Sequence, residues 1–379
     1  MRVVIAPDSF KESLGSPAVA AALAQGWREG DPSATVVEVP MADGGEGTVE
    51  AVLGATGGTR RALEVPDPLG RPVAATYALL PDGRTAVVEV AAATGLALVE
   101  PGLRDAGRAS SYGTGALLAR ALDDGVSSVV LGLGGSASTD GGAGLCQALG
   151  IRLLDDRGET IPPGGDGLAE LATVDLSGAH PRLREVDLVA ACDVDNPLCG
   201  TRGAAAVFGP QKGADPADVD RLDDALRRLA DVVQRHHPRA DPEVAGAGAA
   251  GGIGFAVVAL LGGRLATGVD LVAQAVGLED HVRGADLVVT GEGRLDGQSL
   301  SGKTPVGVLR VAQRHGVPTI AVAGQLGPDV DRLVDAGVTA VFAAAPGPVT
   351  LEQAMADAPQ DLRRLARQLA ATWAAASMS

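Results

Sequence analysis

The two ends of the sequence carry the same alternation of short apolar segments and helical segments. At the N-terminal end, "RVVIAP" (residues 2–7) and "TVVEVP" (35–40) read as buried strands, with a helix expected from Ser16 between them. The same rhythm returns from Ala285. Its expected strands and helices are "ADLVVTG", residues 305–315, "PTIAVAG", residues 328–336 and "TAVFAAA". Strands that alternate with helices predict a parallel sheet with crossover connections.

The middle of the chain follows a different pattern. From Arg60 to Val99, short alternating segments separated by "PDPLG" and "PDGR" predict an antiparallel meander. We therefore predict an α/β fold with two domains. Residues 1–60 and 284–379 would form a doubly wound, Rossmann- or flavodoxin-like domain built from both chain ends. Residues 61–283 would form an inserted second α/β domain with a mixed sheet.

Charge and composition exclude several classes of partner. The net charge of −16 makes nucleic acid an unlikely ligand, because the overall field repels phosphate backbones. No apolar run reaches the roughly 20 residues of a membrane span. The N-terminus shows no signal-peptide pattern, and three scattered cysteines are typical of a reduced compartment, so we expect a cytoplasmic protein.

Lysine is scarce in this chain. Of 31 basic residues only Lys11, Lys212 and Lys303 are lysines, and all three lie in loop-like stretches. A lysine supplies a compact, mobile ammonium group that arginine does not imitate. We therefore expect these three residues to bind an anion.

The stretch "GQSLSGKT" (297–304) matches the phosphate-loop pattern, but its context does not fit. The preceding strand is expected to end near Thr290, seven residues before Gly297. Pro305 should push Thr304 out of helical geometry and leave it as a helix cap. The next strand ends in Gly324 rather than in a magnesium-binding aspartate. We interpret the match as accidental, while Lys303 near a helix start still suits an anion.

Polar and charged residues follow several of the expected strands. These loops are "PDSFK" (7–11), "MADGGEGT" (41–48), "GLGGSASTDGG" (132–142), "CDVDNPL" (192–198) and "GEGRLDGQS" (291–299). In open α/β sheets, ligands bind beyond the carboxyl ends of strands. Carboxylates that hold magnesium, lysines that neutralise phosphate charge and glycine-rich turns together fit phosphoryl transfer.

Other interpretations remain open at this point. Asp8 and Asp43 could simply cap helices. The apolar strand before "DVD" resembles the nucleophile loop of haloacid-dehalogenase-type phosphatases, with Asp193 as phosphoryl carrier. A non-catalytic two-domain anion-binding protein is a third reading.

Taken together, the motifs resemble those of the class I glycerate kinase family. The matching stretches are "IAPDSFKESL", "ADGGEGTVEA", "GTGALL", "GGSASTDGGAG", "ACDVDNPL", "FGPQKGA", "GAGAAGG" and "TGEGRLDGQSLSGKTPVGV". The resemblance implies ATP-dependent phosphorylation of D-glycerate, usually on the 2-hydroxyl, with magnesium and a site in the cleft between two domains. Two residues depart from the family pattern: Tyr112 stands where arginine is expected, and Thr139 where asparagine is common.

The resemblance also suggests roles for individual residues. We expect Asp193 to orient or deprotonate the hydroxyl, with Asp8 as the second candidate and Lys11 beside the transferring phosphoryl group. The expected substrate-binding residues are Ser9, Asn196, Arg294 and Asp296. The expected nucleotide-binding residues are Gly134, Gly135, Ser136, Ser138, Lys212 and Lys303. The expected magnesium-binding residues are Asp43, Glu46 and Glu292. A homodimer is compatible with these expectations.

Overall fold

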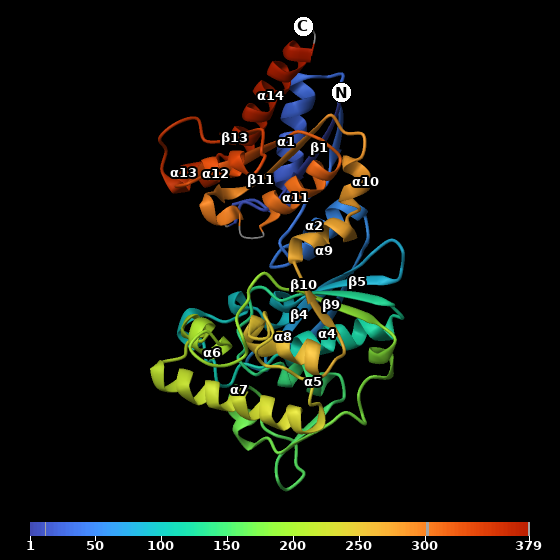
Figure 1. Ribbon diagram of the computed structural model, residues 1–379, viewed down its shortest axis with the longest axis vertical. Coiled ribbons are helices and arrows are strands. Elements are labelled where there is room, and N and C mark those ends of the chain that lie inside the picture. The colour runs from blue at the N-terminus through green and yellow to red at the C-terminus, as the bar shows by residue number, and fades with distance from the viewer. Residues whose placement is uncertain (12, 301–302, 378–379) are drawn as a thin grey trace. The chain divides into compact units, whose positions relative to one another are not determined.

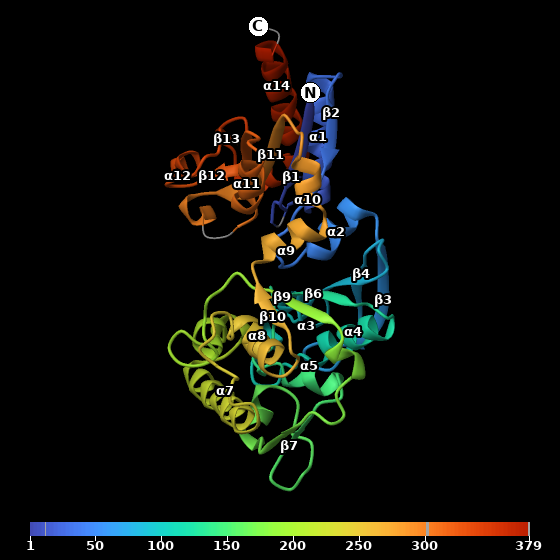
Figure 2. The same ribbon diagram turned by 45° about the vertical axis from the view of Figure 1, so that its right-hand side comes forward.

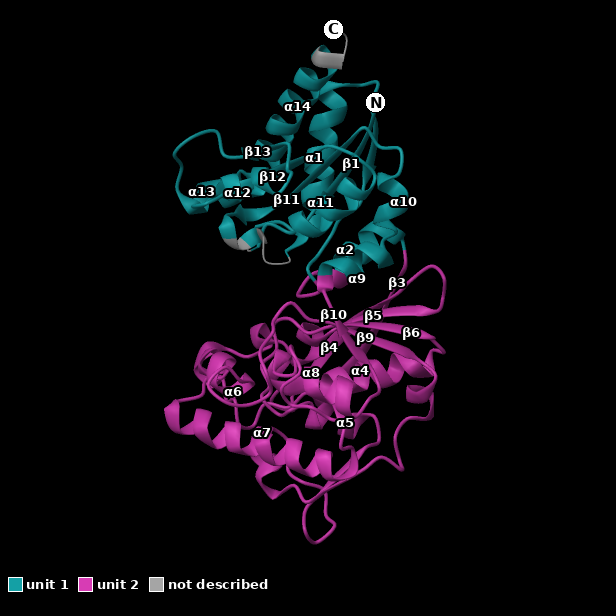
Figure 3. Cartoon of the chain, viewed as in Figure 1, with its two compact units in different colours: residues 1–43, 50–57, 269–379 teal, residues 44–49, 58–268 magenta. Residues whose placement is uncertain are grey.

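The computed structural model describes residues 1–11, 13–300 and 303–377, and the chain divides into two compact units (Figure 3). Unit 1 consists of Met1–Asp43, Glu50–Gly57 and Val269–Ser379. Unit 2 consists of Gly44–Val49 and Gly58–Gly268. The first unit therefore contains both ends of the chain.

Unit 1 is built on a five-stranded parallel sheet with the order β13-β12-β11-β1-β2. Its strands are β1 (Arg2–Pro7), β2 (Thr35–Glu38), β11 (Leu287–Leu295), β12 (Thr319–Leu326) and β13 (Ala340–Ala343). Counted along the chain, this is the flavodoxin-like order 2-1-3-4-5, whose switch point lies between β1 and β11. The predicted doubly wound parallel sheet is thus confirmed.

Helices cover both faces of this sheet (Figures 1 and 2). On one face, α1 (Ser16–Gly30) and α14 (Ala358–Ser377) share an apolar core with β1, β11 and β12. These two helices lie side by side, and Gly26 allows the approach because a side chain there would collide with the backbone of Arg363. On the other face, α11 (Thr304–Arg314) and α12 (Asp331–Asp335) form a second core. The remaining helices of this part are α2 (Thr48–Thr56), α9 (Gly268–Ala275), α10 (Leu278–Val282), α13 (Leu351–Ala356) and the 3-10 turn η6 (Gly297–Leu300).

The contact-based boundary of unit 1 differs from the domain boundary expected at residue 284. Helices α9 and α10 follow residue 268 and pack with unit 1. Arg310 of α11 pairs with Asp270 at 3.0 Å, and Gly307 leaves room for the side chain of Val269. The domain boundaries expected from the sequence stay a prediction. They are residues 1–60 with 284–379 for one domain and residues 61–283 for the other.

Unit 2 contains a six-stranded mixed sheet with the order β10-β9-β6-β5-β4-β3. The first four strands of this order are parallel, and β5, β4 and β3 pair antiparallel. The strands are β3 (Thr59–Pro66), β4 (Pro72–Leu79), β5 (Thr85–Glu89), β6 (Ser128–Gly132), β9 (Asp187–Ala191) and β10 (Arg264–Ala266), and a separate pair is formed by β7 (Arg152–Leu154) and β8 (Thr173–Asp175). The expected meander is confirmed only as far as Glu89. Residues 90–98 instead form α3 (Val90–Thr94) and η1 (Leu96–Leu98), because Val90 and Ala93 are buried at helical spacing.

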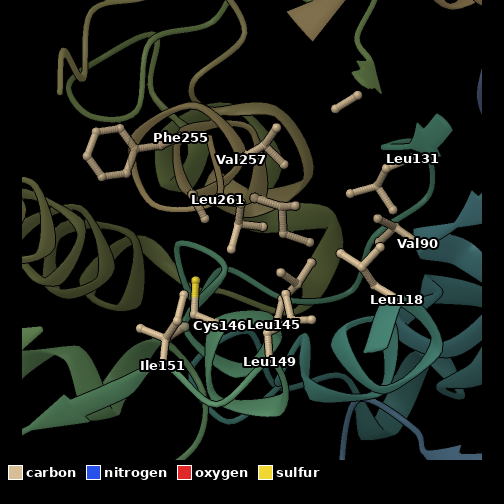
Figure 4. Packing of buried hydrophobic residues seen from close by; sticks show 14 of the residues in the cluster. Val90, Leu118, Leu131, Leu145, Cys146, Leu149, Ile151, Phe255, Val257 and Leu261 are labelled. Carbon is tan, nitrogen blue, oxygen red and sulfur yellow. The ribbon is translucent and has the colours of Figure 1, made fainter. Parts of the chain in front are cut away.

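The core of unit 2 is large and almost entirely aliphatic. Side chains from α4 (Tyr112–Asp123), α5 (Ala143–Ala148) and α8 (Ala249–Ala259) meet in it, among them Leu118, Leu145 and Val257 (Figure 4). The long amphipathic helix α7 (Pro216–His236) begins with a capping box. The other helical segments are α6 (Ala204–Phe208), η2 (Pro101–Leu103), η3 (Gly165–Glu170), η4 (Pro181–Arg184) and η5 (Pro210–Lys212).

Among the helices of the described residues, none combines the length and the apolar character that crossing a membrane requires.

Candidate active site

Asp8 lies at the switch point of the unit 1 sheet, directly after β1. Its backbone N–H donates to the carbonyl of Gly291 on β11 at 2.8 Å. One carboxylate oxygen accepts the N–H of Ser9 at 2.6 Å, and the other accepts the hydroxyl of Thr304 at 2.5 Å. The side chain is buried, so β1, β11 and the start of α11 together fix this carboxylate.

The surroundings of Asp8 disfavour its charge. Burial raises the pKa of Asp8 to about 6, and the carboxylate of Asp43 and, to a smaller extent, that of Glu292 add to the increase. The hydrogen bonds from Thr304 and Ser9 oppose it. A cation placed among these three acidic groups would relieve their repulsion.

Glu292 on β11 is held by two partners. Its carboxylate accepts the hydroxyl of Ser299 at 2.7 Å and the ammonium of Lys303 at 3.2 Å. Burial raises the pKa of Glu292, while Lys303 and Lys11 oppose that shift. Two of the three lysines of the chain therefore act on this acidic cluster.

The other predicted residues of unit 1 lie around the same edge. The ammonium of Lys11 is exposed and stands 3.8 Å from the carboxylate of Asp43. Arg294 donates from Nε to Asp296 at 3.2 Å, with the guanidinium largely exposed. Arg294 and Asp296, both expected to bind substrate, are thus hydrogen-bonded to each other.

The structure corrects two details of the phosphate-loop discussion. Strand β11 continues to Leu295, because its pairing with β12 extends to Leu326, so the expected end near Thr290 is wrong. Lys303 is the N-cap of α11 and Thr304 is its first residue, so the expected cap was one residue too late. The lysine and the threonine of the motif bind Glu292 and Asp8, whereas Ser301 and Gly302 lie outside the described residues.

In unit 2, two glycine-rich segments meet beyond the carboxyl ends of β6 and β9. Gly44 lies against Ala191, so that a Cβ at Gly44 would stand 2.5 Å from that of Ala191. A Cβ at Gly134 would stand 2.7 Å from the Cα of Gly45. Only residues without side chains allow this approach of two backbones. Glu46 is thereby carried to the same edge as the expected nucleotide-binding loop.

Lys212 reaches into that loop from η5. Its side chain is 2% exposed, and its ammonium donates to the hydroxyl of Ser136 at 2.9 Å and to the carbonyl of Ser138 at 2.5 Å. Burial lowers the pKa of Lys212 to about 7, and the charge of Asp140 partly opposes this shift. Lys212 therefore binds the loop itself in this structure.

Asp193 and Asn196 follow β9. Asp193 is exposed, and its carboxylate accepts the N–H of Gly268 at 3.0 Å. Asn196 donates from Nδ2 to the carbonyl of Arg202 at 2.8 Å. Asp195 is engaged by the guanidinium of Arg202 at 3.0 Å, so the two acidic residues of this loop have different partners.

The expected site residues thus fall into two groups. Unit 1 contains Asp8, Ser9, Lys11, Asp43, Glu292, Arg294, Asp296 and Lys303. Unit 2 contains Glu46, Gly134, Gly135, Ser136, Ser138, Asp193, Asn196 and Lys212. The expected magnesium-binding set is therefore divided, with Glu46 on one unit and Asp43 and Glu292 on the other.

No three His, Cys, Asp or Glu side chains of the described residues are grouped closely enough to hold a metal ion. Unit 1 nevertheless offers carboxylate oxygens of the kind that magnesium prefers, and the charges of Asp43 and Glu292 both act on the carboxyl group of Asp8. Magnesium usually binds proteins through one or two carboxylates, with water and substrate phosphates completing its octahedron. The donor set fits a magnesium ion that arrives with a nucleotide.

Several residues of these networks were not selected from the sequence. Thr304 and Ser299 orient Asp8 and Glu292, and Ser111 binds Asp140 through both its N–H and its hydroxyl at 2.8 Å. A hydroxyl residue next to a helix start was a visible signal for Thr304. Nothing in the sequence pointed to Ser111, which is distant from Asp140 along the chain.

Comparison with known proteins places the chain in a family. The model described as the glycerate kinase family matches residues 3–374. The chain belongs to the glycerate kinase family. It is accordingly an enzyme of the phosphotransferase class, which speaks against the haloacid-dehalogenase-type phosphatase and the non-catalytic binding protein.

Relatives match along nearly the whole chain. A glycerate 2-kinase of Escherichia coli K12 is 46% identical over 374 residues, covering 99% of this chain and 98% of its own. A glycerate kinase of Bacillus subtilis 168 is 46% identical over 372 residues, covering 98% and 97%. A crystal structure of a protein assigned as glycerate kinase 2 from Salmonella typhimurium LT2 superposes with a TM-score of 0.92 at 47% identity, covering 100% of both chains.

Proposed function

We propose that this enzyme transfers the γ-phosphoryl group of ATP to the 2-hydroxyl of D-glycerate, giving 2-phosphoglycerate and ADP. The observation that carries the proposal is the cluster at the switch point. The buried carboxyl group of Asp8 lies there under the influence of the carboxylates of Asp43 and Glu292. The ammonium groups of Lys11 and Lys303 pair with Asp43 and Glu292, respectively. This arrangement combines cation-binding oxygens with positive charge for phosphate, which phosphoryl transfer requires.

The glycine-rich loop after β6 is the proposed nucleotide site. Gly134 and Gly135 would present backbone amides to phosphate oxygens, and Ser136 and Ser138 would add hydroxyl groups. Lys303, whose ammonium is partly exposed beside Glu292, would neutralise further phosphate charge.

Magnesium would be held by Asp43, Glu46 and Glu292, directly or through water. When bound, the ion neutralises charge that develops on the transferring phosphoryl group. The raised pKa values of Asp8 and Glu292 fit this proposal, because a cation would favour the charged form of both carboxyl groups.

The substrate would bind through its carboxylate to Lys11 and Arg294, with Ser9, Asn196 and Asp296 orienting its hydroxyl groups. The 2-hydroxyl oxygen would attack the γ-phosphorus while the bond from phosphorus to the ADP oxygen breaks. Asp193 would accept the hydroxyl proton, with Asp8 as the alternative acceptor. A pKa near the working pH is favourable for such a base, and that property supports Asp8 as the alternative.

Neither unit contains the whole set of proposed groups. The acidic cluster belongs to unit 1, whereas the nucleotide loop and Asp193 belong to unit 2. We propose that the two sets act on the same pair of substrates. The cytoplasmic location and a homodimer stay predictions from the sequence.

An assay of the purified protein with ATP, magnesium and D-glycerate tests the proposal. ADP release should require glycerate, and the product should show one phosphorus signal split by a single proton, because the C2 carbon carries one hydrogen. A phosphorus signal split by two equivalent or near-equivalent protons would place the phosphate on C3. ADP release that is independent of glycerate would reject glycerate as the acceptor.

A further inference from the structure

Lys212 is the one buried lysine among those of the described residues. The side chains of Lys11 and Lys303 are 80% and 41% exposed, whereas Lys212 is 2% exposed. Burying an ammonium group is costly unless hydrogen bonds replace its water. For Lys212 the replacements come from the loop after β6, namely the hydroxyl of Ser136 and the carbonyl of Ser138.

A buried carboxylate fixes the far end of the same loop. Asp140 is fully buried and accepts the N–H groups of Gly142 and Gly144, each at 3.1 Å. It also accepts the N–H and the hydroxyl of Ser111 at 2.8 Å. The loop is therefore anchored by an ammonium group at residues 136–138 and by a carboxylate at residue 140.

Backbone contacts complete the support of the loop. The N–H of Leu96 donates to the carbonyl of Gly135, and the N–H of Ala137 donates to the carbonyl of Thr94, both at 2.8 Å. The carbonyl oxygens of Gly135 and Ser138 thus accept hydrogen bonds from protein donors. Their negative charge would therefore repel a bound phosphate less than that of free carbonyl groups. Such pre-organisation favours an anion-binding loop.

Two hydroxyl groups of the loop lack partners. The side-chain oxygens of Ser138 and Thr139 are buried and have no hydrogen-bond partner within the described part of the chain. A buried hydroxyl that makes no hydrogen bond is destabilising, so such groups are retained where a ligand or water satisfies them. They lie directly beside the carbonyl that Lys212 holds.

We propose that Lys212 is a positioning residue, which shapes the nucleotide loop through Ser136 and Ser138 and does not itself contact the phosphate groups. The inference rests on the proposed ATP site and revises the direct role expected for Lys212. Two of the three N–H groups of the Lys212 ammonium donate to Ser136 and Ser138. Because Lys212 is buried, a phosphate oxygen has little access to the third. The phosphate-binding groups are then the backbone amides of the loop.

A double-mutant cycle in the full-length protein tests this assignment. Lys212→Met, Ser136→Ala and the double variant are compared by the KM for ATP at saturating D-glycerate and by calorimetric ADP binding without glycerate. Each single change should weaken nucleotide binding, with Lys212→Met losing about tenfold or more and the KM for glycerate staying within about twofold. The double variant should be no worse than Lys212→Met, because both changes break the same interaction. Losses that multiply would show that the two side chains bind phosphate independently and would overturn the proposal.

Lys212→Arg is the conservative variant that separates the two roles. A lysine that met phosphate at an open site would leave room for a guanidinium that still pairs with phosphate, whereas a buried clamp would not, because the guanidinium is larger and planar. Near-normal ADP affinity of Lys212→Arg would contradict the proposal. If the Lys212 variants do not fold, Ser136→Ala alone is decisive, and an unchanged KM for ATP and ADP affinity would overturn it. Turnover that fails while ADP still binds would reject the glycerate activity and leave this inference standing.

Discussion

At the scale of single residues, the acidic groups of the candidate site differ in their surroundings. Asp8 is buried and tied to Thr304, whereas Asp193 is exposed and tied to the backbone of Gly268. A side chain that receives a proton from substrate needs access, which favours Asp193. A side chain that tunes a charged cluster needs burial, which fits Asp8.

Replacing Asp193 by asparagine should reduce kcat by about 100-fold or more, because an amide does not accept the hydroxyl proton. The matched control is Asp195→Asn in the same loop, where the carboxylate binds Arg202 at the surface. That control should keep kcat within about threefold. Steady-state kinetics of both variants, with thermal melts to compare folding, measure the difference. Equal activity of the two variants would remove Asp193 from the proton-transfer role.

Asp8→Asn should make the protein more stable at neutral pH in magnesium-free buffer while impairing turnover. The folded pKa of Asp8 is about 6 and its ordinary value is 3.8, so the native state binds more protons than the unfolded state between these values. Wild-type stability should therefore fall as the pH rises through this window, by about 1.4 kcal/mol for each unit of pKa difference. Asparagine has no charge to bury, so the gain should appear near pH 7 and vanish below pH 4.

Urea unfolding of both proteins from pH 3.5 to pH 8 measures this effect. Asp31→Asn is a control of opposite sign, because hydrogen bonds from Ser33 lower the pKa of Asp31. That variant should lose stability above the ordinary pKa of aspartate. A stability difference at Asp8 that does not change with pH would contradict the burial of a charged carboxylate.

At the scale of elements, helix starts show what local sequence specifies. The start of α13 carries a capping box between Thr350 and Gln353, a pattern that is visible in the sequence itself. The helix expected from Ser16 is α1, in which Ser16 is the first helical residue and Gly15, rather than the serine, is the N-cap. Local sequence thus locates a helix start to within about one residue.

The glycine-rich segment 44–47 of unit 2 allows a prediction at the scale of elements. Gly44 and Gly47 both have left-handed backbone angles, with φ of 84° and 91°. A Cβ at Gly44 would stand 2.5 Å from that of Ala191, whereas nothing lies within 4 Å of one at Gly47. Gly47→Ala should cost about 1–2 kcal/mol for its backbone angle, and Gly44→Ala about 1–3 kcal/mol more for overpacking. Denaturant unfolding compares the two, and equal losses would argue against the close approach of this segment to β9.

At the scale of the whole molecule, a strongly acidic enzyme is proposed to bind two anionic substrates. The net charge of −16 repels both, so binding depends on local groups rather than on the overall field. The structure supplies such groups on both units, with lysines beside the acidic cluster of unit 1 and a glycine-rich loop in unit 2. Magnesium is expected to join the nucleotide to the carboxylates.

Magnesium with ADP should therefore stabilise the protein. At a concentration one hundred times the Kd, the gain in unfolding free energy is about 2.7 kcal/mol, and a chelator should remove most of it. Glu292→Gln should weaken the magnesium-dependent part of this gain. Glu279→Gln is the matched control, since Glu279 pairs with Arg314 and His315 at the surface. Thermal melts with and without chelator measure both variants, and an identical magnesium effect in Glu292→Gln would exclude that carboxylate from the metal site.

Local sequence predicted the alternating elements of unit 1 and singled out the loops that we propose carry the chemistry. Residues 2–7 and 285–291 predict buried strands because each is a short apolar run that is rich in β-branched side chains. The scarcity of lysine singled out Lys11, Lys212 and Lys303, and all three prove to contact acidic or loop groups. The doubly wound domain followed from the return of the same rhythm at the C-terminal end.

Which of these residues contact one another depends on the packing of distant segments. The hydrogen bond from Thr304 to Asp8 joins positions that are 296 residues apart, and no local pattern encodes a contact over that separation. Strand order likewise placed β1 beside β11 and so created the switch point at which Asp8 lies. The three lysines also differ in burial. Lys11 and Lys303 are exposed or partly exposed and pair with carboxylates, whereas Lys212 is buried and binds a loop. Periodicity records which side of an element is apolar, whereas partners and burial depend on how distant elements pack.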